Sequence, residues 1–393
     1  MSNAETASEQ LTSSAPVLIV NAGSSSLKVK LLPQGRTFLV ERIGGEAAVK
    51  TSLEGEVDAG TITDAESAFK ACLEVLRQEV DLDTIAAVGH RVVHGGERYT
   101  GATHLSEAVI ADLETLSPLA PLHNPANLAG IRAAMSLLPG AVHVAVFDTA
   151  FHSTLPPRAY LYGLPRWAYE KGVRCYGFHG TSHDFVTRRA AEVLGERRED
   201  LKLVSLHLGN GASAAAVKYA QSVDTTMGMT PLAGLLMGTR SGDVDPGALL
   251  YLLEQGVSAE ELDTLLNKKS GLLGLSGVSN DMRDLHAAVG EGNAAAKDAF
   301  EVFCYRIRKT VGAYAAAMEG LDAVIFTGGI GENDAAVRER SVAGLEFLGL
   351  ELDPSKNAQS EGTISTSNSS VRLLVIPTDE ERMIAEATLE VAR

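Results

Sequence analysis

Four short apolar runs, each followed at once by a polar or glycine-rich segment, are the feature of this sequence that most constrains its fold. The runs lie at residues 85–88, 142–147, 203–208 and 323–326. Their length and apolar character predict strands buried on both faces of a sheet. The amphipathic segments between them predict helices, so the pattern indicates an α/β protein. Because open α/β sheets place their chemistry after the strands, we expect functional residues in segments 89–91, 148–152, 209–211 and 327–331.

Two segments have the pattern strand, turn, strand. Residues 17–20 are apolar and lead into the Gly/Ser turn 21–26, after which residues 27–31 alternate between apolar residues and lysine. This alternation predicts a hairpin with one buried face. It is not a Walker phosphate loop, because no G-x-x-x-x-G-K-[ST] occurs in the sequence. Residues 203–217 repeat the pattern, but chance similarity explains the repeat at least as well as two related halves do.

Local patterns characterise two further segments. Thr63 and Glu66 fit a capping box, and the apolar residues that follow at helical spacing predict a helix. These apolar residues are Ala65, Phe69, Leu73, Leu76 and Val80. Residues 359–370 are rich in Ser, Thr and Asn and are predicted to form a surface loop.

Length and charge limit the classes of protein to consider. The chain has 393 residues, enough for two or three domains of roughly 150 residues. Its 34 Lys and Arg residues against 50 Asp and Glu give a formal charge of −16, so no positive surplus exists to neutralise nucleic-acid or membrane phosphates. An anionic substrate therefore needs a local cluster of cationic groups.

Neither secretion nor a membrane span is indicated. No apolar run approaches about 20 residues, and residues 1–15 are polar, so we expect an N-terminal extension rather than a signal peptide. Cys72, Cys175 and Cys304 are odd in number and far apart, which fits neither a disulfide framework nor a zinc knuckle. We expect buried thiols in a cytoplasmic protein.

Several polar residues have both a functional and a structural interpretation. The turn before Lys28 can wrap phosphate oxygens with its backbone N–H groups, or it is an ordinary hairpin loop. Arg240, flanked by glycines, can clamp a carboxylate or a phosphoryl group, or form a surface salt bridge. Asp148 is a metal-associated carboxylate or a helix N-cap. The acidic run 379–381 either supplies a carboxylate to a magnesium ion or forms the first turn of a helix, where acidic residues are favoured by the helix dipole.

Two glycine turns raise the possibility of a nicotinamide-dependent dehydrogenase. The turn 207–212 lacks an acidic residue about 20 positions on, which makes it a poor dinucleotide fingerprint. The turn 327–333 is a better candidate, because Glu351 or Asp353 lies near the distance expected of a ribose-binding carboxylate. However, Asp334 occupies its third glycine position, so this remains a minor alternative.

Two histidine pairs raise the possibility of a metal site. His90 and His94 flank a strand segment and would lie about 13 Å apart, too far for one metal ion. His179 and His183 lack the glutamate of an H-E-x-x-H site. We favour the interpretation that these histidines are hydrogen-bonded within the fold or take part in catalysis.

Ten segments, taken in order, resemble the acetate kinase family. They are found between residues 18 and 381, and several are five or more residues long, so the resemblance is specific. The segments are 21–28, 89–96, 121–125, 147–152, 176–183, 207–211, 237–240, 280–283, 328–333 and the acidic run from Thr378.

The resemblance implies an α/β protein with the two-domain actin-like ATPase (ribonuclease H-like) fold, in which mixed sheets are flanked by helices. It implies domain I at 16–150, to which the C-terminal helix 379–393 returns, and a nucleotide-binding domain II at 151–378. It also implies a cytoplasmic homodimer that converts acetate and ATP to acetyl phosphate and ADP, with Mg²⁺ or Mn²⁺ as cofactor. Neither a nucleic acid nor a membrane is an expected partner.

The family's functional residues carry over onto matching positions of this chain. The catalytic positions are Asp148, His179 and Arg240, of which the last two stabilise the transition state together with Arg91. The substrate-binding positions are Arg91, Val93, Leu122, His123, Phe178 and Pro231. The nucleotide-binding positions are Lys28, Ser24, Ser26, His207, Leu208, Gly209, Asn210, Gly211, Asp281, Met282, Arg283, Gly329, Ile330, Gly331, Glu332 and Asn333. The metal positions are Asn21 and Glu380.

Two positions depart from the family pattern, and two alternatives stay open. Asp379 stands where relatives usually carry Asn, which adds charge beside Glu380, and Ser241 stands where a cysteine is common. Propionate or butyrate as the preferred acid is one alternative, since one methylene is worth only ~1–3 kcal/mol. A nucleotide-driven switch of the same fold, without turnover, is the other.

Overall fold

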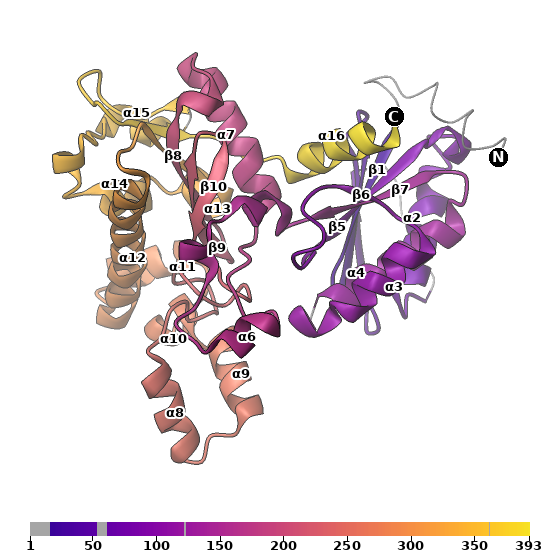
Figure 1. Ribbon diagram of the computed structural model, residues 1–393, viewed down its shortest axis with the longest axis horizontal. Coiled ribbons are helices and arrows are strands. Elements are labelled where there is room, and N and C mark those ends of the chain that lie inside the picture. The colour runs from indigo at the N-terminus through magenta and orange to yellow at the C-terminus, as the bar shows by residue number, and fades with distance from the viewer. Residues whose placement is uncertain (1–15, 53–60, 122, 361) are drawn as a thin grey trace. The chain divides into compact units, whose positions relative to one another are not determined.

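The computed structural model describes residues 16–52, 61–121, 123–360 and 362–393, so the expected N-terminal extension lies outside the described residues. The described chain forms two compact units (Figure 1). The first is built from the described part of Met1–Ala150 together with Asp379–Arg393, and the second is Phe151–Thr378. Within the described ranges, no helix is both long and apolar enough to cross a membrane.

A seven-stranded mixed sheet organises the first unit, in the order β4-β3-β2-β1-β5-β7-β6. The strands are β1 (Val17–Ala22), β2 (Ser26–Leu32), β3 (Arg36–Glu41), β4 (Ala48–Thr51), β5 (Ala87–Val92), β6 (Thr103–His104) and β7 (Val142–Phe147). The predicted hairpin is confirmed, because β1 and β2 pair antiparallel with Val20 opposite Val29. Strands β1, β5 and β7 are parallel neighbours, so their carboxyl ends lie at one edge of the sheet.

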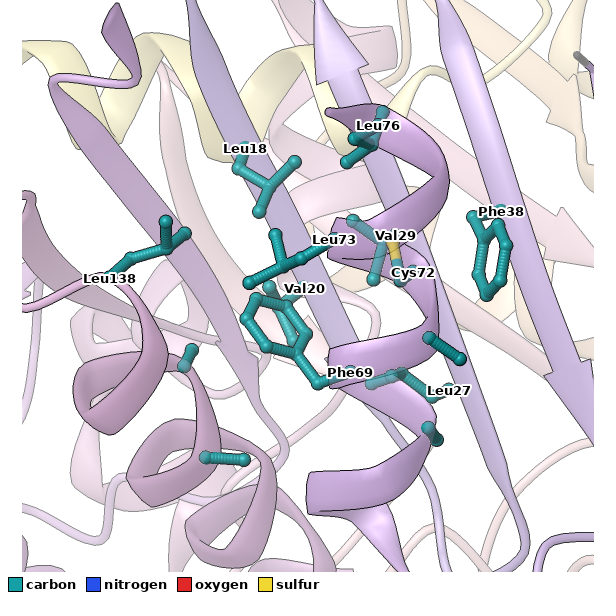
Figure 2. Packing of buried hydrophobic residues seen from close by; sticks show 14 of the residues in the cluster. Leu18, Val20, Leu27, Val29, Phe38, Phe69, Cys72, Leu73, Leu76 and Leu138 are labelled. Atoms are coloured by element: carbon teal, nitrogen blue, oxygen red, sulfur yellow. The ribbon is translucent and has the colours of Figure 1, made fainter. Parts of the chain in front are cut away.

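Four α-helices belong to the described part of this unit, and strand alternation explains how they cover the sheet. They are α2 (Ala65–Leu76), α3 (Glu107–Thr115), α4 (Asn124–Leu137) and α16 (Glu380–Ala392). Leu18 and Val20 of β1 pack with Phe69 of α2 in one core (Figure 2). Val17 and Ile19 point to the opposite face and pack with Ile384 of α16. Because alternate residues of β1 are buried by different helices, the strand is apolar throughout, as its sequence predicted.

The predicted helix near residue 65 exists, but its capping box lies one residue further on. Asp64, not Thr63, is the N-cap, and Ser67 occupies the third helical position in place of the predicted Glu66 partner. The Asp64 carboxylate accepts the N–H of Ser67 at 2.8 Å, while the Ser67 hydroxyl lies 3.1 Å from the Asp64 N–H. The helix ends at Leu76, so Val80 lies outside it.

The segment 89–91, expected to hold functional residues after a buried strand, itself belongs to strand β5. Gly89 pairs with Val144 of β7 and Ile19 of β1, so the strand is held on both sides. A Cβ at Gly89 would lie 2.8 Å from Cγ2 of Ile384 and closer still to Oγ1 of Thr388, both in α16. Glycine is therefore needed here for close helix–sheet contact, not for a turn.

A six-stranded mixed sheet, in the order β10-β9-β8-β11-β13-β12, organises the second unit. Its strands are β8 (Lys202–Leu208), β9 (Ala212–Lys218), β10 (Gln221–Thr225), β11 (Ala323–Thr327), β12 (Gly362–Thr363) and β13 (Arg372–Val375). Strand β8 pairs antiparallel with β9 and parallel with β11. Strand β1 has the same two kinds of neighbour, β2 and β5, so the faint repeat in the sequence corresponds to a shared local topology.

The second unit also contains α-helices in the described part of the chain. They are α5 (Pro157–Tyr160), α6 (Arg166–Glu170), α7 (Gly180–Leu194), α8 (Pro246–Glu254), α9 (Ala259–Lys268), α10 (Gly271–Ser276), α11 (Met282–Gly290), α12 (Ala294–Met318), α13 (Gly328–Asn333), α14 (Ala335–Val342) and α15 (Pro354–Gln359). Helix α13 begins directly after β11, and Asp334, which follows it, is the N-cap of α14.

The Ser/Thr-rich segment 359–370 is not simply a surface loop. Strand β12 lies within it, and Ile364, Ser365 and Ser369 are buried. The Ser369 hydroxyl lies 2.9 Å from the Glu351 N–H and 2.6 Å from the Val371 carbonyl oxygen. The polar side chains of this segment therefore form hydrogen bonds with backbone groups inside the fold.

The three cysteines are free and buried, as expected. Burial raises the pKa of Cys175 and of Cys304 to about 12, and it raises the pKa of Cys72 as well. All three thiols therefore stay protonated and unreactive at neutral pH.

Candidate active site

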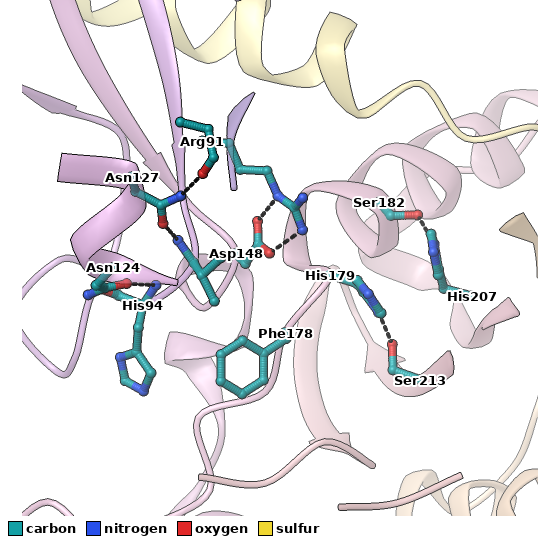
Figure 3. Close-up of polar contacts among 12 residues, drawn as sticks. Arg91, His94, Asn124, Asn127, Asp148, Phe178, His179, Ser182, His207 and Ser213 are labelled. Carbon is teal, nitrogen blue, oxygen red and sulfur yellow. Dashed lines mark hydrogen bonds and ion pairs between the residues drawn. The ribbon is translucent and has the colours of Figure 1, made fainter. Parts of the chain in front are cut away.

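Arg91 and Asp148 form a partly buried ion pair at the carboxyl ends of β5 and β7. The Nε and Nη2 of Arg91 donate to the two carboxylate oxygens of Asp148 at 2.9 and 2.6 Å (Figure 3). The charge of Asp148 raises the pKa of Arg91, outweighing the effect of burial. The sequence left Asp148 as a metal ligand or a helix cap. In the structure its carboxylate forms a bidentate contact with Arg91. The other N–H groups of the guanidinium can then donate to an anion.

A small cavity of about 100 Å³ lies beside this pair in the first unit. Asn21, Lys28 and Arg91 line it together with Glu380 and Glu381 from the first turn of α16. Lys28 forms an ion pair with Glu381. Burial raises the pKa of Glu381, but the hydrogen bond and charge of Lys28 outweigh this and the net shift is downward.

Oxygen atoms that could bind Mg²⁺ line this cavity, alongside the cations Lys28, Lys30 and Arg91. The Asn21 amide and the two carboxylates offer oxygen atoms, the ligands that Mg²⁺ prefers. No cluster of three or more His, Cys, Asp or Glu side chains suited to a metal ion occurs among the described residues. Mg²⁺ typically uses one or two carboxylates and completes its shell with water and substrate phosphates, so this donor set fits it. Ser24 lies in the neighbouring hairpin turn and Ser26 begins β2, and neither lines the cavity.

Two buried asparagines, absent from the predicted site, hold the chain after β5. The Asn127 side chain accepts the Val93 N–H at 3.0 Å and donates to the Ala22 carbonyl at 2.6 Å. Asn124 accepts the His94 N–H at 3.2 Å and donates to its carbonyl oxygen at 3.1 Å. Both come from the first turn of α4, so an Asn pair in a Pro-containing helix start was the available signal. They fix the position of Val93, which is buried.

The remaining predicted substrate residues are distributed over both units. His123 is the N-cap residue of α4 in the first unit, and Leu122 lies outside the described residues. Phe178 is buried in the second unit, where its carbonyl oxygen lies 3.0 Å from Nε2 of His152. The Pro231 carbonyl accepts an N–H from Arg240 at 3.0 Å.

Arg240 and His179 face the same space beside Gly211 in the second unit. A Cβ at Gly211 would lie 3.6 Å from Nε2 of His179 and 3.7 Å from Nη1 of Arg240. Within the described ranges Arg240 makes no ion pair with a carboxylate, and burial lowers its pKa. The surface salt bridge that the sequence left open is therefore not formed. A half-buried cation of this kind is stabilised when an anion binds beside it.

His179 is held in an unusual backbone conformation. Its φ of 55° lies in the left-handed region, which non-glycine residues adopt rarely and which costs about 1–3 kcal/mol. The residue precedes α7 as its N-cap, and its ring stacks on that of His207 with centroids 4.3 Å apart. The Ser182 hydroxyl lies 2.7 Å from Nδ1 of His207. Strain of this kind is typical of residues whose position serves a function.

A larger cavity of about 480 Å³ collects most of the predicted nucleotide segments in the second unit. Of the predicted residues, Gly209, Asn210, Asp281, Met282, Arg283, Gly329, Ile330 and Asn333 line it. Asn280 and Asp334 also line it, although neither was a predicted site residue. His207, Leu208, Gly211, Gly331 and Glu332 belong to the same segments but do not line this cavity.

Hydrogen bonds fix the walls of this cavity. Asp281 caps α11 and pairs with Arg283, whose side-chain and backbone N–H groups lower the pKa of Asp281 to about 2. Glu332 accepts the backbone N–H of Gly328 at 2.8 Å and that of Thr378 at 3.1 Å, which ties the end of β11 to the chain after β13. Glu332 therefore fixes the position of the glycine-rich wall without lining the cavity itself.

The carboxylates required by the dehydrogenase alternative have other roles. Asp353 caps α15 by accepting the N–H groups of Ser355 and Lys356. The Glu351 carboxylate accepts from the Thr366 hydroxyl at 3.0 Å. Neither carboxylate lines the 480 Å³ cavity beside the 327–333 turn.

Comparison with known proteins gives a consistent result. A family model described as the acetokinase family matches residues 16–386. The chain is 52% identical to an acetate kinase of Thermotoga maritima, over 95% of this chain and 98% of that relative. It is 51% identical to an acetate kinase of Bacillus subtilis, over 96% and 99% of the two chains. The crystal structure of Porphyromonas gingivalis acetate kinase aligns with a TM-score of 0.90 at 44% identity, covering 96% of this chain and all of that one. A propionate kinase from Francisella tularensis aligns with a TM-score of 0.87 at 38% identity, with the same coverage.

Proposed function

Because this chain belongs to the acetokinase family, we propose that it catalyses the reversible transfer of a phosphoryl group from ATP to acetate, giving acetyl phosphate and ADP. The observation that carries the proposal is that His179 and Arg240 both lie beside Gly211. A transferring phosphoryl group spreads negative charge over its equatorial oxygens, so catalysis depends on placed donors and positive charge. A half-buried arginine beside a histidine supplies both.

The other predicted residues have complementary roles in this proposal. Arg91, already oriented by Asp148, binds the acetate carboxylate with its remaining N–H groups. The 480 Å³ cavity binds the nucleotide, which assigns nucleotide binding mainly to the unit 151–378. Lys28 contributes a further cation to the phosphates.

A divalent cation belongs to the same proposal. Asn21 and Glu380 hold Mg²⁺ or Mn²⁺ in the 100 Å³ cavity. When bound, the ion neutralises phosphate oxygen charge. Asp379, which caps α16 and lies 3.7 Å from Lys30, adds a charge beside Glu380 that the family pattern lacks.

We further propose that the protein is a cytoplasmic homodimer. Helix α8 supports the dimer, because none of its residues is buried although it is strongly apolar. Leu250, Tyr251 and Leu253 are all exposed on it, as is Trp167 of α6. A second copy would remove this apolar surface from water. Light scattering after size-exclusion chromatography measures the mass, and a monomer at micromolar concentration would contradict the proposal.

The test of the activity is acyl phosphate formation. Protein is incubated with ATP, Mg²⁺ and acetate, propionate or butyrate, and the product is trapped with hydroxylamine. We expect acetate to give the most hydroxamate. Arg240→Ala should lower kcat by roughly 10²–10³-fold, because it removes a charged donor to the transition state. Arg189→Ala, which changes an exposed arginine on α7, is the matched control.

The possible outcomes separate the candidates. Propionate-dominant product would move the assignment to the activity named for the Francisella tularensis neighbour. No product from any acid, with ATP still bound, would favour a nucleotide-driven switch. Near-normal kcat in Arg240→Ala would remove Arg240 from the chemistry.

A further inference from the structure

One buried hydroxyl group joins two histidines in the second unit. Ser213 lies fully buried on β9, and its Oγ is 2.9 Å from Nδ1 of His179 and 2.8 Å from Nε2 of His183. The other ring nitrogen of His183, Nδ1, lies 2.8 Å from the Oγ of Ser205 on β8. A continuous chain of hydrogen bonds therefore leads from β8 to the His179 ring, and Figure 3 shows its last contact.

The number of protons in this chain limits how it can be arranged. His183 is fully buried, and burial lowers its pKa well below 6.5, helped by His152 and His207, so its ring is neutral at neutral pH. A neutral imidazole has one N–H and one acceptor nitrogen, and a hydroxyl has one proton to donate. His183 can therefore donate to Ser213 or to Ser205, but not to both.

Two arrangements satisfy every atom of the chain. In the first, Ser205 donates to His183, His183 donates to Ser213, and Ser213 donates to Nδ1 of His179. Neutral His179 then carries its proton on Nε2. The reverse arrangement puts that proton on Nδ1 and leaves a lone pair on Nε2. Because Nε2 faces the space that Arg240 also faces, a lone pair there would repel phosphoryl oxygens, whereas an N–H would bind them.

We propose that Ser213 is a positioning residue that holds neutral His179 as its Nε2–H tautomer, so that the ring donates a hydrogen bond to the phosphoryl group. The inference rests on the role of His179 in the proposed function. The stacked ring of His207 restrains the face of the imidazole, and Ser213 restrains its edge. Orientation is thereby fixed from two directions, while Ser213 itself reaches the substrate only through His179.

The tautomer can be measured without any assay of activity. In protein labelled with ¹⁵N at histidine, the ring signals of His179 are identified by their loss in His179→Gln. At pH 8 we expect a protonated Nε2 and an unprotonated Nδ1. Ser213→Ala should give a mixture of tautomers, because it removes the donor to Nδ1. Ser222→Ala is the matched control, since it removes a buried hydroxyl that bonds His152 and lies outside this chain, and it should leave the His179 tautomer unchanged. A wild-type ring protonated on Nδ1 overturns the proposal, and so does an unchanged tautomer in Ser213→Ala.

Kinetics separate a positioning role from a structural one. Ser213→Ala should lower kcat by roughly 10²-fold, the loss typical of a misplaced catalytic group, with little change in the KM for either substrate. In a His179→Gln background the same change should have no further effect, because the two residues act as a unit. An equal loss in both backgrounds would show general structural damage and overturn the proposal. If the wild-type protein forms no acyl phosphate, the proposed function fails, and the NMR result still decides which tautomer Ser213 holds.

Discussion

Replacing Gly89 by alanine tests how closely α16 packs on the first sheet. The new Cβ would lie 2.8 Å from Cγ2 of Ile384 and closer still to Oγ1 of Thr388, so either α16 or β5 must shift. Overpacking of this kind costs ~1–3 kcal/mol. Removing a glycine from the unfolded chain returns ~0.4–1 kcal/mol. We therefore expect a net destabilisation of about 1–2 kcal/mol, located at α16.

Hydrogen exchange measured by mass spectrometry locates this effect. A loss of 1–2 kcal/mol corresponds to exchange that is roughly 5–30-fold faster in peptides from α16. Gly140→Ala is the control, because Gly140 is exposed and a Cβ there meets no atom within 4 Å. Thr388→Ala removes one of the clashing atoms, so Gly89→Ala should cost ~1 kcal/mol less in that background. Unchanged α16 exchange in Gly89→Ala, or strict additivity of the two changes, would refute the reasoning.

Three further predictions concern the site and the response to pH. Arg91→Lys keeps the charge but loses the planar fork, so the KM for acetate should rise by roughly 10–100-fold; an unchanged KM would exclude Arg91 from carboxylate binding. Glu380→Gln should raise the Mg²⁺ concentration for half-maximal activity by roughly tenfold, measured by metal titration, and an unshifted midpoint would exclude it as a ligand. Burial lowers the pKa of His90, and lowers that of His152 from 6.5 to about 4, so both stay neutral in the folded protein while the unfolded chain binds protons. Their contribution to stability is complete above pH 6.5 and falls as the pH drops toward 4, by up to ~1.4 kcal/mol per pH unit for each residue. In urea unfolding, His90→Gln should flatten this dependence and the exposed His104→Gln should not; equal slopes in both would contradict the prediction.

Most of the strands could be predicted because their burial is recorded in local patterns. Residues 27–31 alternate with a period of two, and β2 has one buried face. The continuation of β5 through Gly89 could not be predicted in this way. A Gly-His-Arg sequence locally favours a loop, and only the neighbouring strands and the helix α16, almost 300 positions later, make it a strand. Tertiary contacts of this kind override local propensity.

The capping error has a different cause. Thr63 and Asp64 are both good N-cap residues, so the sequence offers two starts one residue apart. Ser67 decides between them, because its hydroxyl can reach back to the N–H of Asp64. The capping-box pattern requires Glu or Gln at the third helical position, so it does not recognise Ser67.

Part of the candidate site was predictable because it consists of short segments of adjacent residues. The glycine-rich segments are recognisable because their residues are adjacent in sequence, and eight predicted nucleotide residues do line one cavity. Ser213 leaves no comparable signal. Ser213 is a single hydroxyl in a run of alanines, and its role depends on the register that places it opposite His207 on β8. Only the paired strands show that it can reach two histidines.

Arg91 of the first unit and Arg240 of the second differ in a way that the sequence does not show. Asp148 neutralises Arg91, so what Arg91 can offer a substrate is mainly the geometry of its N–H groups. No carboxylate pairs with Arg240 in the described part of the chain, and its half-buried position makes its charge more effective. In a chain of net charge −16, that charge is a local exception to the overall field. The oriented N–H groups of Arg91 suit a planar carboxylate. The charge of Arg240 suits a phosphoryl group in transfer, and a kinase that phosphorylates a carboxylate needs both kinds of contact.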